Sequence, residues 1–393
     1  GENNVAKKMA YVALSVVAVT LVVVDALLAL GTLWQGLPCI GTFANLLTVG
    51  NMQAWVPLVA VVTLVCVLVA HFHGGRLFGA LWVVSLVTLA CGVYFAATEL
   101  FSINDSGGDA SLLASYEGEA DRSDVTMDTE RYEDTISDDS LLDVYRVDDG
   151  ATDKPVVLYV HGGGWSGGSR KEGEAYLEQF AEAGYVAVSA EYDLSSSEFH
   201  GAATVEQQLT YAVAWIQDNV AAYGGSTDRF YVIGDSAGGN LGLDLAYKIC
   251  DGTYREAGGT TLPKVDAVSV LYPVTDMAAC YTNDYPLFTD AAHQMVGDYM
   301  GTTPDEDPEL YASLSPINYV GSDSPATCIM VGDHDTAVSP TQSYTLQERL
   351  AEAGVDNKLV KVAYANHLFD MGGTNIGAQG YMGITLSWFS AHQ

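Results

Sequence analysis

The sequence predicts two unlike parts: an all-α region of three membrane-spanning helices, and then an α/β domain with a mainly parallel sheet covered by helices on both faces. Long apolar runs occupy the first hundred residues, and short apolar strands alternate with helical segments in the rest. The charge is divided just as unequally. Residues 1–101 carry three basic and three acidic residues, so the rest of the 393-residue chain carries the whole net charge of −33. So acidic a chain argues against nucleic-acid binding, which needs a basic surface.

Three apolar runs account for the predicted transmembrane region of residues 1–101. The runs are Met9–Leu30, Ala54–Ala70 and Leu77–Phe101. The predicted spans are about 9–30, 52–71 and 77–101. The first run has 22 residues, which is about 33 Å of helix and enough to cross a bilayer core. Its length, and the two runs that follow it, argue against a cleaved signal peptide.

A few charges bear on the orientation of these spans. Lys7 and Lys8 precede the first span, and Arg76 lies in the short connector before the third. Basic residues favour the cytoplasmic side, so three spans place the acidic domain outside the cytoplasm. Asp25 lies within the first span, where a carboxylate often marks function. We expect it instead to face a neighbouring helix or the headgroups.

Residues 102–124 are expected to form an acidic polar tether, and residues 125–393 a catalytic domain in which strands and helices alternate. The predicted strands are 156–160, 185–190, 230–233, 265–272, 327–331 and 358–363. The predicted helices are 172–183, 204–223, 237–249, 341–353 and 378–392. This alternation is typical of a parallel sheet with helices on both faces. Ligands then bind beyond the carboxyl ends of the strands.

The strand at 230–233 runs into Gly234-Asp235-Ser236-Ala237-Gly238-Gly239. This is a G-x-S-x-G pattern between a strand and a helix, and its small neighbours permit the strained turn that exposes a serine hydroxyl. The helix N-terminus stabilises negative charge that develops there. We therefore predict Ser236 as a nucleophile; the alternative is a glycine-rich turn with an incidental serine.

The strand at 156–160 runs into His161-Gly162-Gly163-Gly164-Trp165. Consecutive glycines let backbone N–H groups approach a substrate oxygen, so Gly163 and Gly164, with the N–H of Ala237, are predicted to form an oxyanion hole. The alternative, a phosphate-binding loop, lacks the Lys-Ser/Thr ending of a P-loop. We interpret His161 as a brace for this loop and not as the catalytic base.

A serine nucleophile needs a base, and the base needs an orienting acid. The chain order should be serine, acid, histidine. His367 follows the last strand and is predicted as the base. After the strand at 327–331, Asp333 and Asp335 compete for the role of the acid. Asp335 lies further into the turn and is favoured, which leaves Asp333 to cap the loop or support the site.

On these motifs, residues 155–393 resemble α/β-hydrolase carboxylesterases of the hormone-sensitive-lipase-like type, and also bacterial feruloyl and acetyl-xylan esterases. The resemblance implies an α/β-hydrolase fold. Its G-x-x-D-x-x-V block maps onto Gly332, Asp335 and Val338, which supports Asp335 over Asp333. Its H-G-F block maps onto His367-Leu368-Phe369, with Leu in place of Gly. Tyr192-Asp193-Leu194 stands where relatives have Tyr-Arg-Leu, so a structural Arg contact is missing.

Residues 273–326, between the fourth and fifth predicted strands, are expected to form a short cap. This insertion holds six aromatic residues: Tyr281, Tyr285, Phe288, Tyr299, Tyr311 and Tyr319. We favour ordinary packing for them over stacking on a sugar or an aryl acyl group. The sequence shows no metal-ligand cluster and no nucleotide motif, so we expect neither a metal nor a cofactor.

Together these features predict a membrane-anchored serine esterase that acts through an acyl-enzyme on short acyl or acetyl esters. The substrate would be a small-molecule, glycan or lipid ester, and the bilayer would hold the three helices. A serine peptidase of related fold is one alternative, although no propeller-sized N-terminal domain is present. A non-catalytic sensor or assembly protein is another, although all three members of the triad are present.

Overall fold

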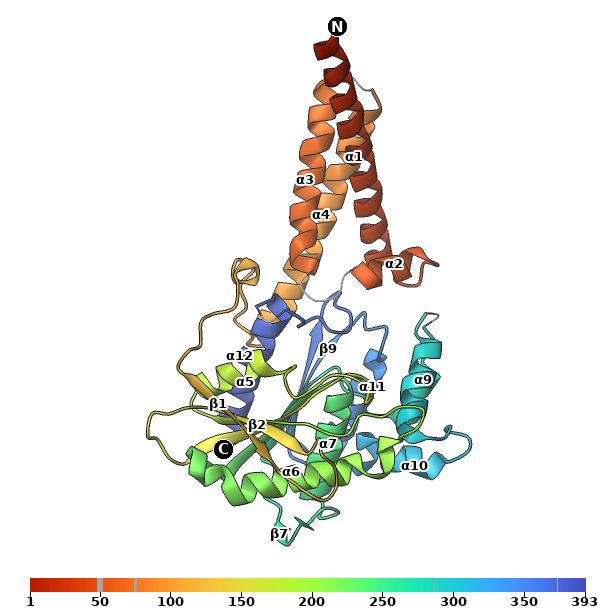
Figure 1. The fold of residues 1–393 in the computed structure, drawn as a ribbon. Helices are drawn as coiled ribbons and strands as arrows, with labels where there is room; N and C mark the ends of the chain where they lie inside the picture. Colours follow the sequence, from red (N-terminus) through yellow and green to blue (C-terminus); the bar gives the residue numbers. More distant parts are fainter. Residues whose placement is uncertain (48–51, 74–75, 286, 373) are drawn as a thin grey trace. The chain divides into compact units, whose positions relative to one another are not determined.

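The computed structural model describes residues 1–47, 52–73, 76–285, 287–372 and 374–393 (Figure 1). The chain divides into two compact units. The helical unit comprises residues 1–118, 332–334 and 362–380. The sheet unit comprises residues 119–331, 335–361 and 381–393. The helical unit thus includes two short segments from late in the sequence, each of which follows a strand.

The helical unit is built from long apolar helices. Its helices are α1 (Glu2–Leu33), α2 (Ile40–Leu47), α3 (Met52–Phe72) and α4 (Arg76–Asn104), followed by the 3-10 turn η1 (Ala114–Tyr116). Three of them, α1, α3 and α4, are long and apolar enough to cross a membrane, with mean hydropathies of 2.6, 2.4 and 2.0. Their predicted helical runs are confirmed, whereas the short helix α2 was not predicted.

The bundle exposes apolar side chains outward and encloses polar ones. Val16, Val62 and Val87 are all more than half exposed, so the outer surface of the bundle is apolar. Asp25 is 5% exposed and Glu99 only 2%. The prediction that Asp25 faces a neighbouring helix is confirmed. Glu99, which the sequence analysis counted only as a charge, is a second buried carboxyl in the same bundle.

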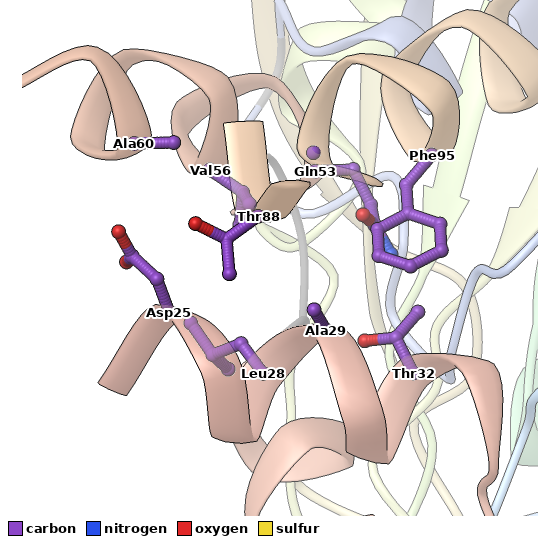
Figure 2. Close-up of a pocket in the computed structure, with 10 residues that line it drawn as sticks. Asp25, Leu28, Ala29, Thr32, Gln53, Val56, Ala60, Thr88 and Phe95 are labelled. Atoms are coloured by element: carbon purple, nitrogen blue, oxygen red, sulfur yellow. The ribbon is translucent and has the colours of Figure 1, made fainter. Parts of the chain in front are cut away.

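A small cavity lies between α1, α3 and α4 (Figure 2). It measures about 10 Å³, which is room for about one water molecule. Asp25 and Thr32 of α1, Gln53 of α3 and Thr88 of α4 contribute polar groups to its wall. Within the described residues, Asp25 Oδ2 and Gln53 Oε1 accept no hydrogen bond.

The sheet unit is organised around a mostly parallel sheet of eight strands, with the order β1-β2-β4-β3-β5-β8-β9-β10. The strands are β1 (Val125–Arg131), β2 (Leu141–Val147), β3 (Lys154–Val160), β4 (Val186–Ala190), β5 (Gly225–Asp235), β8 (Ala267–Leu271), β9 (Ala326–Gly332) and β10 (Asn357–Val362). The pairs β4–β3, β3–β5, β5–β8 and β8–β9 are parallel, while β1 and β2 are antiparallel. A separate hairpin joins β6 (Glu256–Ala257) and β7 (Thr260–Thr261).

Helices cover both faces of this sheet (Figure 1). They are α5 (Glu174–Glu182), α6 (Val205–Asn219), α7 (Ala237–Cys250), α11 (Pro340–Glu352) and α12 (Ile376–Ala391), with 3-10 turns η2 (Gly201–Ala203) and η3 (Val220–Tyr223). Phe389 of α12 stacks on Phe180 of α5 and on Tyr231 of β5. On the other face, Leu209 of α6 and Leu346 of α11 join a core cluster with α7. Each strand and helix predicted in the α/β part is confirmed.

The insertion between β8 and β9 forms the helices α8 (Met277–Thr282), α9 (Thr289–Met300) and α10 (Pro308–Ser313) and the turn η4 (Pro316–Tyr319). Tyr299 and Tyr311 are buried there. Tyr299 stacks on Trp165 of the glycine-rich loop, with ring centroids 5.0 Å apart and an interplanar angle of 10°. Tyr299 therefore packs the cap against the glycine-rich loop, which is the ordinary packing role that the sequence favoured.

Candidate active site

Ser236 occupies a strained turn between β5 and α7. Its φ of 53° and ψ of −117° place it in the left-handed half of backbone space, which costs on the order of 1–3 kcal/mol for a non-glycine residue. The glycines on either side make the turn possible. A Cβ on Gly234 would lie 2.4 Å from the carbonyl oxygen of Gly238, and one on Gly238 would lie 2.0 Å from that of Val160. Both ends of the G-x-S-x-G motif are therefore sterically required to be glycine.

Hydrogen bonds hold this turn in place. The Ser236 N–H donates to the carbonyl of Leu271, at the end of β8, over 2.9 Å. The Ser236 carbonyl accepts from the N–H of Asn240 over 3.0 Å. The buried side chain of Asn240 donates to the carbonyls of Val274 and Leu314. Asn240 thus ties the first turn of α7 to the cap, a role that its type and position alone did not suggest.

The loop after β3 presents backbone N–H groups beside this turn. Gly163 has φ 117° and Gly164 has φ 61°, which only glycine adopts without strain. Within the described residues, the N–H groups of Gly163, Gly164 and Ala237 donate to no other protein group. The loop leaves little space, because a Cβ on Gly164 would lie 2.5 Å from the sulfur of Met295.

A network of His161, Glu191 and Arg170 supports the glycine-rich loop. His161 is fully buried, and its Nδ1 lies 2.7 Å from the carbonyl of Gly162 and its Nε2 3.1 Å from the Glu191 carboxylate. Its ring stacks on Tyr192. Burial opposes ionisation of Glu191, but the hydrogen bond from His161 and the contacts with Arg170 outweigh it, so the pKa of Glu191 is lowered. The prediction that His161 braces the loop is confirmed.

Asp193, which stands where relatives carry arginine, belongs to a polar cluster of its own. Its carboxylate accepts from the Ser137 hydroxyl over 2.5 Å, and its N–H donates to the Gln208 side chain over 2.9 Å. The arginine contact in this region comes instead from Arg170. Its guanidinium donates to Asp143 and Glu191, over 3.0 and 3.2 Å.

Asp335 lies in a tightly held turn after β9. Its side chain is 6% exposed, and its Oδ1 accepts from the N–H groups of Ala337 and Val338, both over 2.9 Å. The Asn283 amide of the cap donates to the carbonyls of Thr336 and Ala337 over 3.2 and 2.8 Å. The turn therefore holds the Asp335 carboxyl in one orientation.

Asp333, the competing acid, is engaged elsewhere. It belongs to the helical unit, where its Oδ1 accepts from the N–H of Tyr364 over 2.8 Å and lies 2.6 Å from Nδ1 of His334. These contacts suit loop capping, one of the two roles predicted for Asp333. His367 also lies in the helical unit, and its N–H donates to the side chain of Asn366 over 2.7 Å.

The structure therefore divides the predicted site residues between the two units. Ser236, Asp335 and the three residues predicted to form the oxyanion hole lie in the sheet unit, whereas His367 lies in the helical unit. The pairing of His367 with the other two members of the triad stays a prediction. Across the described ranges, no group of three His, Cys, Asp or Glu side chains is arranged to hold a metal ion.

Backbone strain gathers at the carboxyl ends of the strands. Among the described residues, eight non-glycine residues have positive φ. Five of the eight follow β3, β5, β8 or β10: Trp165, Ser236, Tyr272, Tyr364 and Leu368. Leu368 has φ 60°, and it stands where the H-G-F block of the esterases that this chain resembles has glycine. Strain of this kind is typical of functional sites, and it marks the edge at which ligands are expected.

A comparison with known families identifies the α/β part. The BD-FAE family model matches residues 142–350, just over half of the chain. The chain belongs to the BD-FAE family. This BD-FAE chain is 29% identical over 245 residues to Esterase LipQ of Mycobacterium tuberculosis, covering 60% of this chain and 56% of LipQ. It is 30% identical over 217 residues to Carboxylesterase NlhH of the same organism, covering 52% of this chain and 63% of NlhH. The chain thus spans little more than half the length of these relatives.

Solved structures share the fold of this BD-FAE chain at low sequence identity. Esterase B from Lactobacillus rhamnosis is 21% identical with a TM-score of 0.59, covering 75% of this chain and 95% of that one. A truncated carbohydrate esterase from gut microbiota is 22% identical with a TM-score of 0.56, covering 70% of this chain and 99% of that one. The predicted α/β-hydrolase fold is confirmed.

Proposed function

We propose that this BD-FAE chain is a membrane-anchored serine hydrolase of carboxylic esters. The observation that carries the proposal is the strained Ser236 at the N-terminus of α7, beside three backbone N–H groups that bond no other described protein group. This combination suits attack on a carbonyl group and stabilisation of the oxyanion that results. The names of LipQ and NlhH, an esterase and a carboxylesterase, point to the same chemistry.

The proposed mechanism has two stages. The Ser236 hydroxyl attacks the ester carbonyl while His367 takes its proton, and Asp335 holds the imidazole in the productive tautomer. The N–H groups of Gly163, Gly164 and Ala237 would receive the carbonyl oxygen as it becomes negative. His367 returns the proton to the departing alcohol, which leaves an acyl-enzyme. Water activated by His367 then hydrolyses the acyl group and frees Ser236.

We propose short acyl or acetyl esters as substrates. Met295 of the cap lies against Gly164, and Trp165, the next residue, stacks on Tyr299 of the cap, so a small acyl group suits this loop better than a long chain. The alcohol part would be a small molecule, a glycan or a lipid. One structural neighbour is described as a carbohydrate esterase, which places glycan esters among the first substrates to test.

We propose that α1, α3 and α4 anchor the enzyme in a bilayer with the catalytic domain outside the cytoplasm. Their length and hydropathy support spanning, and Lys7, Lys8 and Arg76 favour the cytoplasmic side for the N-terminus and the α3–α4 connector. An odd number of spans then places the residues after α4 on the opposite side.

Hydrolysis by the full chain in nanodiscs tests the proposal. The panel would hold p-nitrophenyl acetate, butyrate, octanoate and palmitate, with acetylated xylan and methyl ferulate. We expect turnover of the acetyl and butyryl esters that Ser236→Ala abolishes. Turnover that survives Ser236→Ala, or a folded chain with no turnover on any of these esters, would contradict the proposal.

A further inference from the structure

The ends of the long apolar helices bind the two loops that follow β9 and β10. All of these groups belong to the helical unit. The Gln35 side chain, just after α1, donates from Nε2 to the carbonyl of His334 over 2.7 Å. The buried Gln53 side chain at the start of α3 donates from Nε2 to the carbonyl of Tyr364 over 2.8 Å. Both side chains thus bond the backbone of segments some 300 residues away in sequence.

Asn366 connects the short helix α2 directly to His367. Its side chain is 4% exposed. Its Nδ2 donates to the carbonyl of Asn45 in α2 over 2.9 Å, while its Oδ1 accepts from the N–H of His367 over 2.7 Å. A single buried amide thus joins the backbone of α2 to the backbone of the predicted base.

Aromatic side chains of helix α4 pack against the same loop. The Tyr364 ring packs on Phe95 and Tyr94, with centroids 4.9 and 5.7 Å apart. The Ser102 hydroxyl accepts from the N–H of Ala363 over 3.1 Å. Tyr364 has φ 57°, a strained conformation that persists only where the surroundings hold it.

Two of these contacts, those of Gln35 and Ser102, lie just beyond the apolar runs. Helix α1 has 32 residues and α4 has 29, or about 48 and 44 Å, against a hydrocarbon core of about 30 Å. The apolar runs 9–30 and 77–101 fill that core, so Gln35 and Ser102 come just after it. A displacement of these helix ends would therefore move the loop that carries His367, because hydrogen bonds and ring contacts connect the two.

We propose that the membrane helices position the catalytic base, with Asn366, Gln35 and Gln53 as positioning residues for His367. The inference rests on the proposed function, because it takes His367 to be the base. The membrane region is then part of the catalytic scaffold as well as an anchor. A displacement of about 1 Å at a catalytic group lowers the rate by about 100-fold, so loss of one of these contacts is expected to reduce kcat.

Three variants of the full chain in nanodiscs break three different contacts. Gln35→Met and Gln53→Met keep the side-chain length and remove the donors to His334 and Tyr364, and Asn366→Ala removes the bridge to α2. The matched control is Thr98→Val on α4, whose hydroxyl bonds the carbonyl of Tyr94 in its own helix. The substrate is p-nitrophenyl butyrate, measured with every variant in nanodiscs of the same lipid at the same concentration.

We expect kcat to fall about 10- to 100-fold in Asn366→Ala and in Gln53→Met, with KM and the gel-filtration profile unchanged and with Thr98→Val equal to wild type. If all three variants keep kcat within twofold of Thr98→Val while His367→Ala loses at least 100-fold, the inference is overturned and the proposed function stands. If His367→Ala itself keeps full activity, the proposed function fails first. Three separate contacts are tested, so the outcome does not depend on the folding of any one variant.

Discussion

At the scale of single residues, positive φ and close packing at the strand ends distinguish the groups to which we assign chemistry. Ser236 holds a left-handed backbone conformation that its glycine neighbours permit. The two acids that the sequence left in competition differ in their surroundings. Asp335 is buried and held by the N–H groups of its own turn, whereas Asp333 is more exposed and bonds Tyr364 and His334.

This difference predicts unequal effects of two matched substitutions. Asp335→Asn is expected to lower kcat about 10³- to 10⁴-fold, because the base loses the acid that fixes its tautomer. Asp333→Asn keeps an oxygen that can accept from the Tyr364 N–H, and is expected to lower kcat by less than about tenfold. Steady-state kinetics of the two purified variants checks the assignment, and equal losses would reopen it.

The oxyanion hole is tested at Gly164. Gly164→Ala places a Cβ at φ 61°, 2.5 Å from the sulfur of Met295, and is expected to lower kcat about 100- to 1,000-fold by displacing an oxyanion donor. Gly259→Ala is the matched control. Gly259 also has positive φ, 85°, but open space around its Cβ in the β6–β7 hairpin. A similar loss of kcat in both variants would indicate general strain and not a catalytic donor.

At the scale of elements, the sequence predicted six strands of the sheet and the five long helices that cover it, because hydrophobic periodicity and glycine stops are local signals. No bounds were predicted for β1, β2, the β6–β7 hairpin or the helices of the cap. It did not predict α2, whose eight residues follow Pro38 in an uncharged connector and give too short a signal. It also did not predict the bonds from Gln35, Gln53 and Asn45 to the loops after β9 and β10. Such contacts join residues some 300 positions apart. The sequence around one of these residues does not indicate which distant residue it will contact.

Helices α6 and α7 share a buried charged cluster whose behaviour depends on pH. Asp244 of α7 is fully buried and lies near Glu206 of α6 and Lys248, its carboxyl 3.7 Å from the Lys248 Nζ. Burial, and after it the negative charge of Glu206, raises the pKa of Asp244 well above its ordinary value of 3.8. Folding therefore takes up a proton at Asp244 above about pH 4.

The sign of the effect follows from that proton uptake. Stability contributed by this group falls as pH rises from 3.8 toward the raised pKa, because the unfolded chain has already lost the proton. Asp244→Asn mimics the protonated carboxyl. The difference in apparent Tm, variant minus wild type, is therefore expected to increase from about pH 4.5 to about pH 7.5. Thermal melts of both proteins across this range check the prediction, and parallel curves would contradict it.

At the scale of the whole molecule, an apolar region with no net charge and a strongly acidic α/β domain are joined in one chain. The basic residues near the apolar helices predict its orientation. Gly259→Cys, in a background that carries Cys39→Ser, offers a thiol on the exposed β6–β7 hairpin. A membrane-impermeant maleimide is expected to label this thiol in intact cells. Labelling only after the cells are opened would place the hydrolase domain in the cytoplasm.

We propose Ser236 as the nucleophile of a serine hydrolase whose base is His367. A fluorophosphonate probe applied to the full chain in nanodiscs, followed by mass spectrometry of the peptides, tests both roles in one experiment. We expect one adduct per chain, on Ser236, absent in Ser236→Ala and formed at least about 100-fold more slowly in His367→Ala. No adduct on the folded chain, or an adduct on Ser236 that forms at the same rate without His367, would contradict it.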